Sequence, residues 1–215
     1  MKTINWKDHL VNLIVVILGI TIAFYLEGYG ESKTESKLEE KYISNLRKDL
    51  ENDLELLDTL IVVNENILRS LIRISEGSTG KAVSEDSVTT YLFSFLYNPR
   101  FTPQRTTYES LKSSGSIGLI NDFELRTRLI ELYEQYYRGA DQYDQAIEEH
   151  IRDFLKPYFI HSVDFENDGT VNSNFMKSSE FRNIIFTYRY LFRDKSTFYK
   201  KVKEELEGVK KELAS

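Results

Sequence analysis

The sequence predicts an all-α protein with a single N-terminal transmembrane helix followed by an elongated antiparallel helical bundle. Three observations support this fold class. Residues 10–26 form a continuous apolar stretch, apolar residues recur at helical spacing in three long later stretches, and no stretch shows the alternation of a half-buried strand. We therefore expect a membrane anchor at residues 1–30, with the span at about 9–27, and an extramembrane domain at residues 31–215.

The apolar stretch is expected to be a permanent anchor in the membrane lipid. Its helix would be roughly 26 Å long, close to the ~30 Å of a bilayer core, and Trp6 and Tyr25 would lie near the two interfaces. The stretch is longer than the apolar part of a usual signal peptide, and Thr21 and Ala23 make a poor cleavage site.

One face of the predicted span carries small or polar residues. Asn12, Gly19 and Ala23 share this face with Val16 and Leu26, at alternating spacings of four and three. Helices in lipid associate by close approach at small residues, so the face is a candidate for self-association or for binding a partner helix. The alternative is that Gly and Ala are simply common in membrane helices.

Charge and composition exclude several functions. The chain has a formal charge of −6, which disfavours nucleic acid as a partner. It contains no cysteine, so disulfides and thiolate metal sites are absent.

The first long helix after the span is expected to begin near Ser32, with Gly28 and Gly30 acting as a hinge before it. It should end at the turn formed by residues 77–80. Its buried stripe is expected to be apolar except at Asn64. We expect Asn64 to be buried and hydrogen-bonded. The stripe is Leu46, Leu50, Leu54, Leu57, Ile61, Asn64, Leu68 and Leu71.

Shorter helices are expected between the long ones. One should begin after Ser84 and end before the prolines at 99 and 103. Thr106 with Glu109, and then Asn121 with Glu124, resemble capping boxes that would start two further helices.

Two more long helices complete the predicted bundle. The first ends at Pro157, and after a polar loop at residues 161–174 the second runs from Phe181 to the C-terminus. Only Lys195 interrupts the apolar stripe of the last helix. The expected stripes are Leu129, Tyr133, Tyr136, Ala140, Tyr143, Ile147, Ile151 and Phe154, and then Tyr188, Phe192, Lys195, Tyr199, Val202, Leu206, Val209 and Leu213.

The stretch TYESLKSSG at residues 107–115 has two interpretations. Its small residues, above all Gly115 in a left-handed conformation, would let a helix stop, reverse and restart. Alternatively, its hydroxyl and backbone N–H groups could bind an anion. We favour the structural interpretation.

Candidate metal and catalytic residues are few. Asp164, Glu166 and Asp168 match the start of a calcium-binding loop, but Phe175 occupies the position of the final bidentate Glu, so an ordinary turn is favoured. The three histidines do not form a metal-binding or catalytic pattern. No catalytic residue and no cofactor is therefore predicted, and we do not expect an enzyme. Arg182, Arg189 and Arg193 could share one helix face and bind an anionic partner, although a solvated face is the simpler interpretation.

Three stretches together resemble an uncharacterised family of small, single-span bacterial membrane proteins common in Bacteroidota. They are residues 14–24, residues 41–61 and residues 107–137, which carry the motif Thr107, Tyr108, Glu109, Leu111, Ser113, Ser114 and Gly115 with Leu119 and Ile120. The chain differs from the family at Asn12, where the family has Glu, and at Tyr29, where it has Trp. The resemblance covers the chain up to about Tyr137 and implies a helical domain on one span. It implies no activity.

The preferred hypothesis is an interaction or scaffold protein of the bacterial envelope, anchored in the inner membrane, which binds other envelope proteins or itself. Because Lys7 lies next to the span and the tail before it is short, the domain is expected in the periplasm. One alternative is a sensor-like domain that binds a ligand between its helices and acts through a partner. A third is an unrecognised hydrolase.

Overall fold

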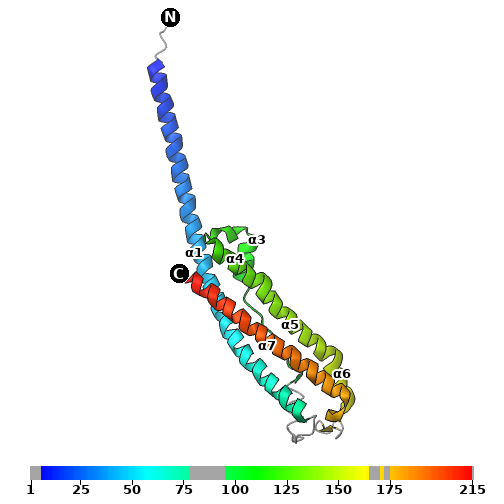
Figure 1. Ribbon diagram of the computed structural model, residues 1–215. Helices are drawn as coiled ribbons and strands as arrows, with labels where there is room; N and C mark the ends of the chain where they lie inside the picture. Colours follow the sequence, from blue (N-terminus) through cyan, green and yellow to red (C-terminus); the bar gives the residue numbers. More distant parts are fainter. Residues whose placement is uncertain (1–5, 78–94, 165–169, 172–174, 215) are drawn as a thin grey trace.

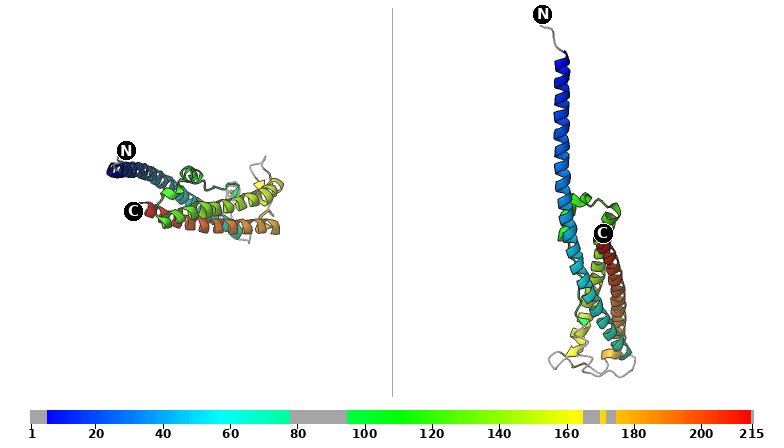
Figure 2. Two further views of the ribbon diagram at one scale, coloured as in Figure 1. Left: turned by 90° about the horizontal axis from the view of Figure 1, so that it is seen from above. Right: turned by 90° about the vertical axis from the view of Figure 1, so that its left-hand side faces the viewer.

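The computed structural model describes residues 6–77, 95–164, 170–171 and 175–214. It has the predicted fold class: a long N-terminal helix extends from an elongated helical bundle (Figure 1). The helices pack side by side along the bundle, while the N-terminal part of α1 projects alone beyond it (Figure 2). We call the end of the bundle next to this projection the near end, and the opposite end the far end.

Helix α1 (Trp6–Gly77) is continuous over 72 residues. It contains the one stretch, among the described residues, that is long and apolar enough to cross a membrane, and none of that stretch is buried. The predicted hinge at Gly28 and Gly30 is wrong, because both residues are helical. An isolated Gly costs a helix only about 1 kcal/mol, which is too little to break one whose neighbours all favour the helical conformation. The predicted domain boundary at residue 30 thus lies inside a helix.

The chain returns from the far end to the near end as an extended trace, and residues 97–105 of this return segment have neither helix nor strand (Figure 1). Helix α3 (Thr106–Ser113), a 3₁₀ turn η1 (Ser116–Leu119) and α4 (Phe123–Glu131) follow at the near end. Most of the helix predicted after Ser84 lies outside the described residues.

Both predicted helix starts at the near end need correction. Thr106 is the first residue of α3, and Arg105 at its N-cap makes no side-chain cap. The cap of α4 is Asp122, one residue after the predicted Asn121, and its carboxylate accepts hydrogen bonds from the N–H groups of Glu124 and Leu125. Asn121 instead binds Glu39 of α1.

From α4 the helix continues to the far end through two π-helical turns. The order is α4, the π turn η2 (Leu132–Tyr136), α5 (Tyr137–His150), the π turn η3 (Ile151–Leu155) and α6 (Lys156–Ser162). Pro157 therefore does not end the helix. Proline has no N–H and clashes with the carbonyl group four residues earlier, and the π turn directly before it relieves both problems.

Each π turn adds one residue and rotates the buried face of the helix. The predicted stripe holds up to Tyr133, after which Tyr137 and Asp144 are buried in place of Tyr136 and Tyr143. After the second turn Leu155 is buried and Phe154 is 56% exposed. The predicted Ala140, Ile147 and Ile151 are buried. The prediction fails at Tyr136, Tyr143 and Phe154, each one residue before a buried position, because it assumed an unbroken α-helical period.

At the far end, β1 (Val163–Asp164) pairs antiparallel with β2 (Thr170–Val171), and η4 (Phe175–Lys177) leads into α7 (Ser179–Leu213). Helix α7 returns to the near end, antiparallel to α1 and α5 (Figure 1). Ser178 caps its start, and Arg47 of α1 donates from Nε to the carbonyl of Leu213 at 2.6 Å. Every residue of the stripe predicted for α7 is buried, including Lys195.

The core has two parts, one around Leu46, Tyr133 and Val202 in the near half and one around Ile74, Ile151 and Phe181 in the far half. In α1 the buried stripe keeps a strict heptad spacing. It includes Asp53, Leu60 and Ile67 where Leu54, Ile61 and Leu68 were predicted; those three are only half-buried. Asn64 is buried as expected, but its side-chain Oδ1 and Nδ2 form no hydrogen bond within the described structure.

Candidate functional site

The most strongly polar part of the interior surrounds the return segment. Extended backbone that packs against helices cannot form its own helical hydrogen bonds, so its buried N–H and C=O groups need other partners. Helices α1, α5 and α7 each supply buried polar side chains to this segment. They are Asp53, Asp144, Lys195 and Tyr199, together with Tyr133 and Tyr137 of the helix that contains α5.

Lys195 and Asp144 form a fully buried ion pair, with 2.7 Å between Nζ and Oδ1. Nζ also donates to the carbonyl of Pro99 at 2.6 Å and to Oδ1 of Asn98 at 2.9 Å. The carboxylate of Asp144 accepts from the N–H of Phe101 at 3.1 Å and from the hydroxyl of Tyr199 at 2.7 Å. Burial lowers the pKa of Lys195, and the Asp144 carboxylate opposes that shift. The pair thus joins α5, α7 and the return segment.

Asp53 holds the next part of the return segment from α1. Its carboxylate accepts from the N–H of Gln104 at 2.8 Å and from the hydroxyl of Tyr137 at 2.7 Å. Burial raises the pKa of Asp53 to about 6; the charge of Asp49 adds to that shift, while the two hydrogen bonds and Arg105 oppose it. Tyr133 donates to the carbonyl of Gln104 at 3.2 Å. These polar groups are therefore occupied in holding the backbone.

The buried tyrosines of the described bundle also have internal hydrogen-bond partners. Tyr108 donates to Glu134, Tyr158 to the carbonyl of Phe175, and Tyr188 to the carbonyl of Phe95. A buried phenol normally needs such a partner, since leaving it unpaired costs free energy. The hydroxyl groups of these buried tyrosines are therefore paired inside the bundle. Tyr137 and Tyr158 also line open surface clefts, Tyr137 together with Arg105 and Arg138.

The 107–115 motif forms the bend at the near end. Leu111 is buried in the core, and Tyr108 stacks on Tyr133 with 4.2 Å between ring centroids. Gly115 has φ of 71°, the left-handed conformation predicted for it. The hydroxyl of Ser114 donates to the carbonyl of Ser110 at 2.7 Å. Thr107 and Glu109 lie on α3, half-buried and exposed, and Ser113 bonds back to Ser110. These contacts favour the structural interpretation of the motif.

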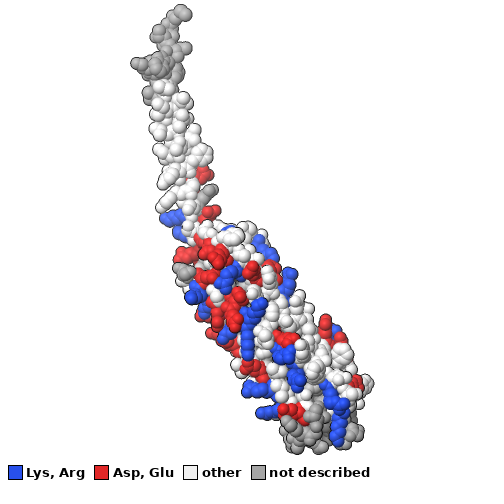
Figure 3. All heavy atoms as spheres, in the orientation of Figure 1, with Lys and Arg blue, Asp and Glu red and all other residues white. Residues whose placement is uncertain are grey.

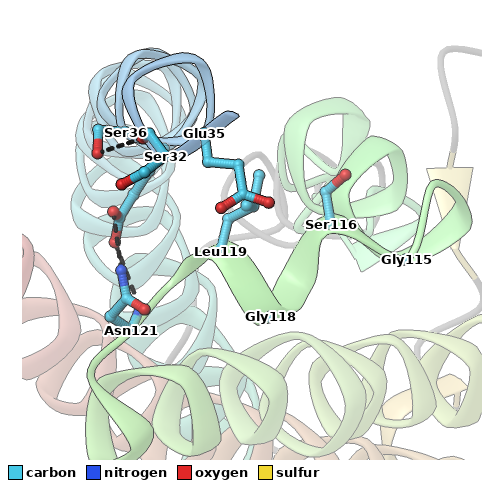
Figure 4. A pocket seen from close by; sticks show the side chains of 9 residues that line it. Ser32, Glu35, Ser36, Gly115, Ser116, Gly118, Leu119 and Asn121 are labelled. Atoms are coloured by element: carbon cyan, nitrogen blue, oxygen red, sulfur yellow. Dashed lines mark hydrogen bonds between the residues drawn. The ribbon is translucent and has the colours of Figure 1, made fainter. Parts of the chain in front are cut away.

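A surface cleft of about 490 Å³ separates this bend from the projecting part of α1 (Figure 4). Glu35 extends into the space between α1 and the η1 turn, and Glu39 accepts from the side-chain amide of Asn121 at 3.1 Å. Ser32, Ser36 and Ser116 add hydroxyl groups to its lining. Carboxylates and hydroxyls would suit a cation, but the cleft is open and Glu39 is already paired.

The candidate calcium-binding residues and the histidines can be located only in part. Within the described residues no group of three or more His, Cys, Asp or Glu side chains is placed to hold a metal ion. Glu166 and Asp168 of the calcium-loop hypothesis lie outside the described residues, and for Asp164 only its backbone place in β1 is described. His150 is buried with its Nε2 3.0 Å from the carbonyl of Ile184, and burial lowers its pKa.

The residues predicted for the membrane anchor all lie on α1. Asn12, Gly19, Ala23 and Tyr25 are exposed along its projecting part, with Tyr25 at 74%. Only the helical backbone of Trp6 is described. An exposed apolar helix of this kind fits a lipid-facing segment.

Sequence comparison places the chain in a family. A family model described as a family of unknown function, DUF6090, matches residues 12–190. The chain belongs to this family. The match begins in the apolar part of α1, extends well past Tyr137 and includes both Asp53 and Asp144, whereas Lys195 and Tyr199 lie beyond it. No curated protein and no solved structure matches the chain.

Proposed function

We propose that this DUF6090 protein is a membrane-anchored interaction protein of the bacterial envelope. In this proposal the apolar part of α1 crosses the inner membrane, and the bundle presents a helical surface to other envelope proteins in the periplasm. The chemistry of the interior supports a binding role over a catalytic one, because its polar groups are engaged with the return segment.

The observation that carries the proposal is the continuity of α1. A single helix includes both the apolar stretch and one wall of the bundle, with no break at Gly28 or Gly30. Such a helix fixes the distance and the rotation of the bundle relative to the membrane. A fixed surface is useful for positioning partners, whereas a merely tethered domain needs only a flexible linker.

The test is purification of the tagged full chain from its native membranes, next to a variant with a Gly-Gly-Ser-Gly insertion after Gly30. We expect defined proteins to co-purify in near-stoichiometric amounts with the parent. The insertion should reduce their yield without unfolding the bundle, since it lies before the first core residue, Leu46. If no protein co-purifies with the parent, the proposed function is wrong.

The periplasmic orientation can be measured separately. A reporter fused after Ser215 that is active only outside the cytoplasm should give activity, because Lys7 favours a cytoplasmic N-terminus. Activity of a cytoplasm-only reporter at the same site would reverse the orientation.

A further inference from the structure

Three ion pairs connect the surfaces of α1 and α7. Glu51 pairs with Lys210 at 2.9 Å, Asp58 with Lys203 at 2.6 Å, and Glu65 with Lys200 at 2.7 Å. The acids recur every seven residues of α1, always opposite a lysine of α7. We call this row the ion-pair ladder.

The row of acids stops at its fourth heptad position on α1. Seven residues beyond Glu65 and Lys200, towards the far end, stand Ile72 and Arg193. Arg193 pairs with its own neighbour Asp194 at 3.2 Å, and its guanidinium lies 3.9 Å from the ring centroid of Tyr190. An apolar side chain thus replaces the expected acid.

Exposed apolar side chains lie on both helices in this part of the bundle, and the rings of Phe186 and Tyr190 are 6.5 Å apart. Ile72 is 40% exposed, Phe186 58% and Tyr190 50%. Arg189 lies 5.6 Å from the ring of Phe186 and reaches Ser75 of α1 at 3.4 Å. We call Ile72, Phe186, Arg189, Tyr190 and Arg193 the arginine-aromatic patch.

The patch has the composition of a protein-binding hot spot. Tyr, Phe and Arg are the side chains enriched at the centres of such interfaces, and Arg binds carboxylates through two parallel hydrogen bonds. Acidic side chains crowd the near half of the face drawn in Figure 3 and thin out towards the far end. With two guanidinium groups and one adjacent carboxylate, Asp194, the patch keeps an excess of positive charge within a chain of net charge −6.

A second copy of this chain is a poor occupant. Two copies anchored in one membrane would lie parallel, so that the patch would meet either itself or a surface at the same height. Meeting itself would place arginine against arginine. Exposed acids at the height of the patch, Glu148 and Glu149, lie on α5, beside His150, which stacks on Tyr188. A contact between them and the patch of a second copy would be heterologous and would build a ring or an open array instead of a closed dimer.

We infer that the arginine-aromatic patch binds an acidic segment of a different protein, with carboxylates on Arg189 and Arg193 and apolar side chains on Phe186, Tyr190 and Ile72. This inference rests on the proposed function and identifies the surface through which it acts. It also fixes the chemistry of the partner, which must alternate negative charge with aromatic or aliphatic side chains.

The test uses two polymers as probes for the full chain in detergent: polyglutamate, and a random copolymer of glutamate and tyrosine. We expect binding of both in spite of the negative net charge of the protein, tighter binding of the copolymer, and weakening as salt is added. Arg189→Glu with Arg193→Glu should weaken both by about tenfold or more. Phe186→Ser with Tyr190→Ser should abolish only the preference for the copolymer.

Arg152→Glu is the matched control, because Arg152 pairs with its neighbour Asp153 as Arg193 does with Asp194. The control should change binding by less than about twofold. The inference is overturned if the parent binds neither polymer, or if the control weakens binding as much as the double variant. If no protein co-purifies with the parent, the proposed function is wrong. Binding of the polymers would still show whether the patch recognises acidic segments.

Discussion

Lys195 shows how one residue can connect separate elements. Burying a lysine inside an apolar stripe normally destabilises a protein, because the charged ammonium group loses its contacts with water. Here its ammonium group has an acceptor from α5, Asp144, and two from the return segment, Asn98 and the carbonyl of Pro99. A buried ion pair of this kind need not add net stability, but breaking it leaves a charge uncompensated.

Replacing Lys195 by Met therefore tests the network. The substitution keeps the volume of the side chain and leaves the Asp144 carboxylate buried without its cation, so the free energy of unfolding should fall by about 3–5 kcal/mol. Lys200→Met is the control, because its pair with Glu65 is exposed and should contribute little to stability. Equal unfolding curves in denaturant for the two variants would refute the role assigned to Lys195.

Asp53 should make stability depend on pH. Because burial raises its pKa from 3.8 to about 6, the folded protein holds a proton more tightly than the unfolded chain does. Its contribution is fully present below about pH 4 and is lost as the pH rises through about 6. The direction is opposite to that of acids with lowered pKa values, such as Glu134 and Glu65.

The comparison of the parent with Asp53→Asn isolates this effect. Asn cannot titrate. Between pH 4 and pH 7 the unfolding free energy of the parent should therefore fall, relative to that of the variant, by on the order of 2–3 kcal/mol. Denaturant titrations at a series of pH values measure it. A difference that is constant with pH would mean that Asp53 is ionised throughout.

The sequence indicated only part of this network. Lys195 was visible because it interrupts a regular apolar stripe, but Asp53 and Asp144 looked like any of the 34 acidic residues. Their burial follows from a return segment that packs as extended backbone, and its partners depend on tertiary contacts. Residue propensities and the spacing of apolar residues along the chain do not indicate these tertiary contacts.

At the scale of elements, the two π turns explain both a success and a failure of prediction. The stripe of α7 was predicted in full because that helix is regular from Ser179 to Leu213. Between residues 129 and 155, in the helix that contains both π turns, the prediction missed three positions by one residue, Tyr136, Tyr143 and Phe154. Pro157 gives a sequence signal for the second turn, whereas we find no comparable signal for the first.

Two glycines allow a test of how closely helices approach. A Cβ on Gly139 of α5 would lie 2.5 Å from Cζ of Phe198, a half-buried ring of α7 whose centroid is 5.0 Å from that of Tyr143 on α5. A Cβ on Gly208 of α7 would meet only the end of the flexible Arg128 side chain. The two positions thus differ in whether the neighbouring group can move away.

Gly139→Ala should destabilise the protein by about 1–2 kcal/mol, because overpacking outweighs the gain in helix propensity. Gly208→Ala should be neutral or stabilising by up to about 1 kcal/mol, since the guanidinium of Arg128 can shift. Thermal unfolding followed by circular dichroism compares them directly. If the order is reversed, the helices approach each other differently from the packing described.

For the whole molecule, the central question is whether α1 is a rigid connection. The sequence suggested separate units, because a Gly-Tyr-Gly stretch after an apolar segment commonly marks a linker, and the structure has a helix there instead. No side chain lies within 4 Å of where a Cβ on Gly28 or Gly30 would be. Rigidity at this point depends only on the helical hydrogen bonds of the backbone.

Distances between spin labels can measure this rigidity, and the absence of cysteine makes labelling specific. Cysteines at the exposed positions Tyr25 and Lys48 lie on either side of Gly28 and Gly30, and a continuous helix places them roughly 35 Å apart. The control pair, Lys48 and Arg69, lies roughly 32 Å apart on the part of α1 that packs in the bundle. We expect equally narrow distance distributions for the full chain in lipid nanodiscs. A broad distribution with shorter distances for the first pair alone would show that the glycines act as a hinge, and the bundle would then not be held at a fixed distance from the membrane.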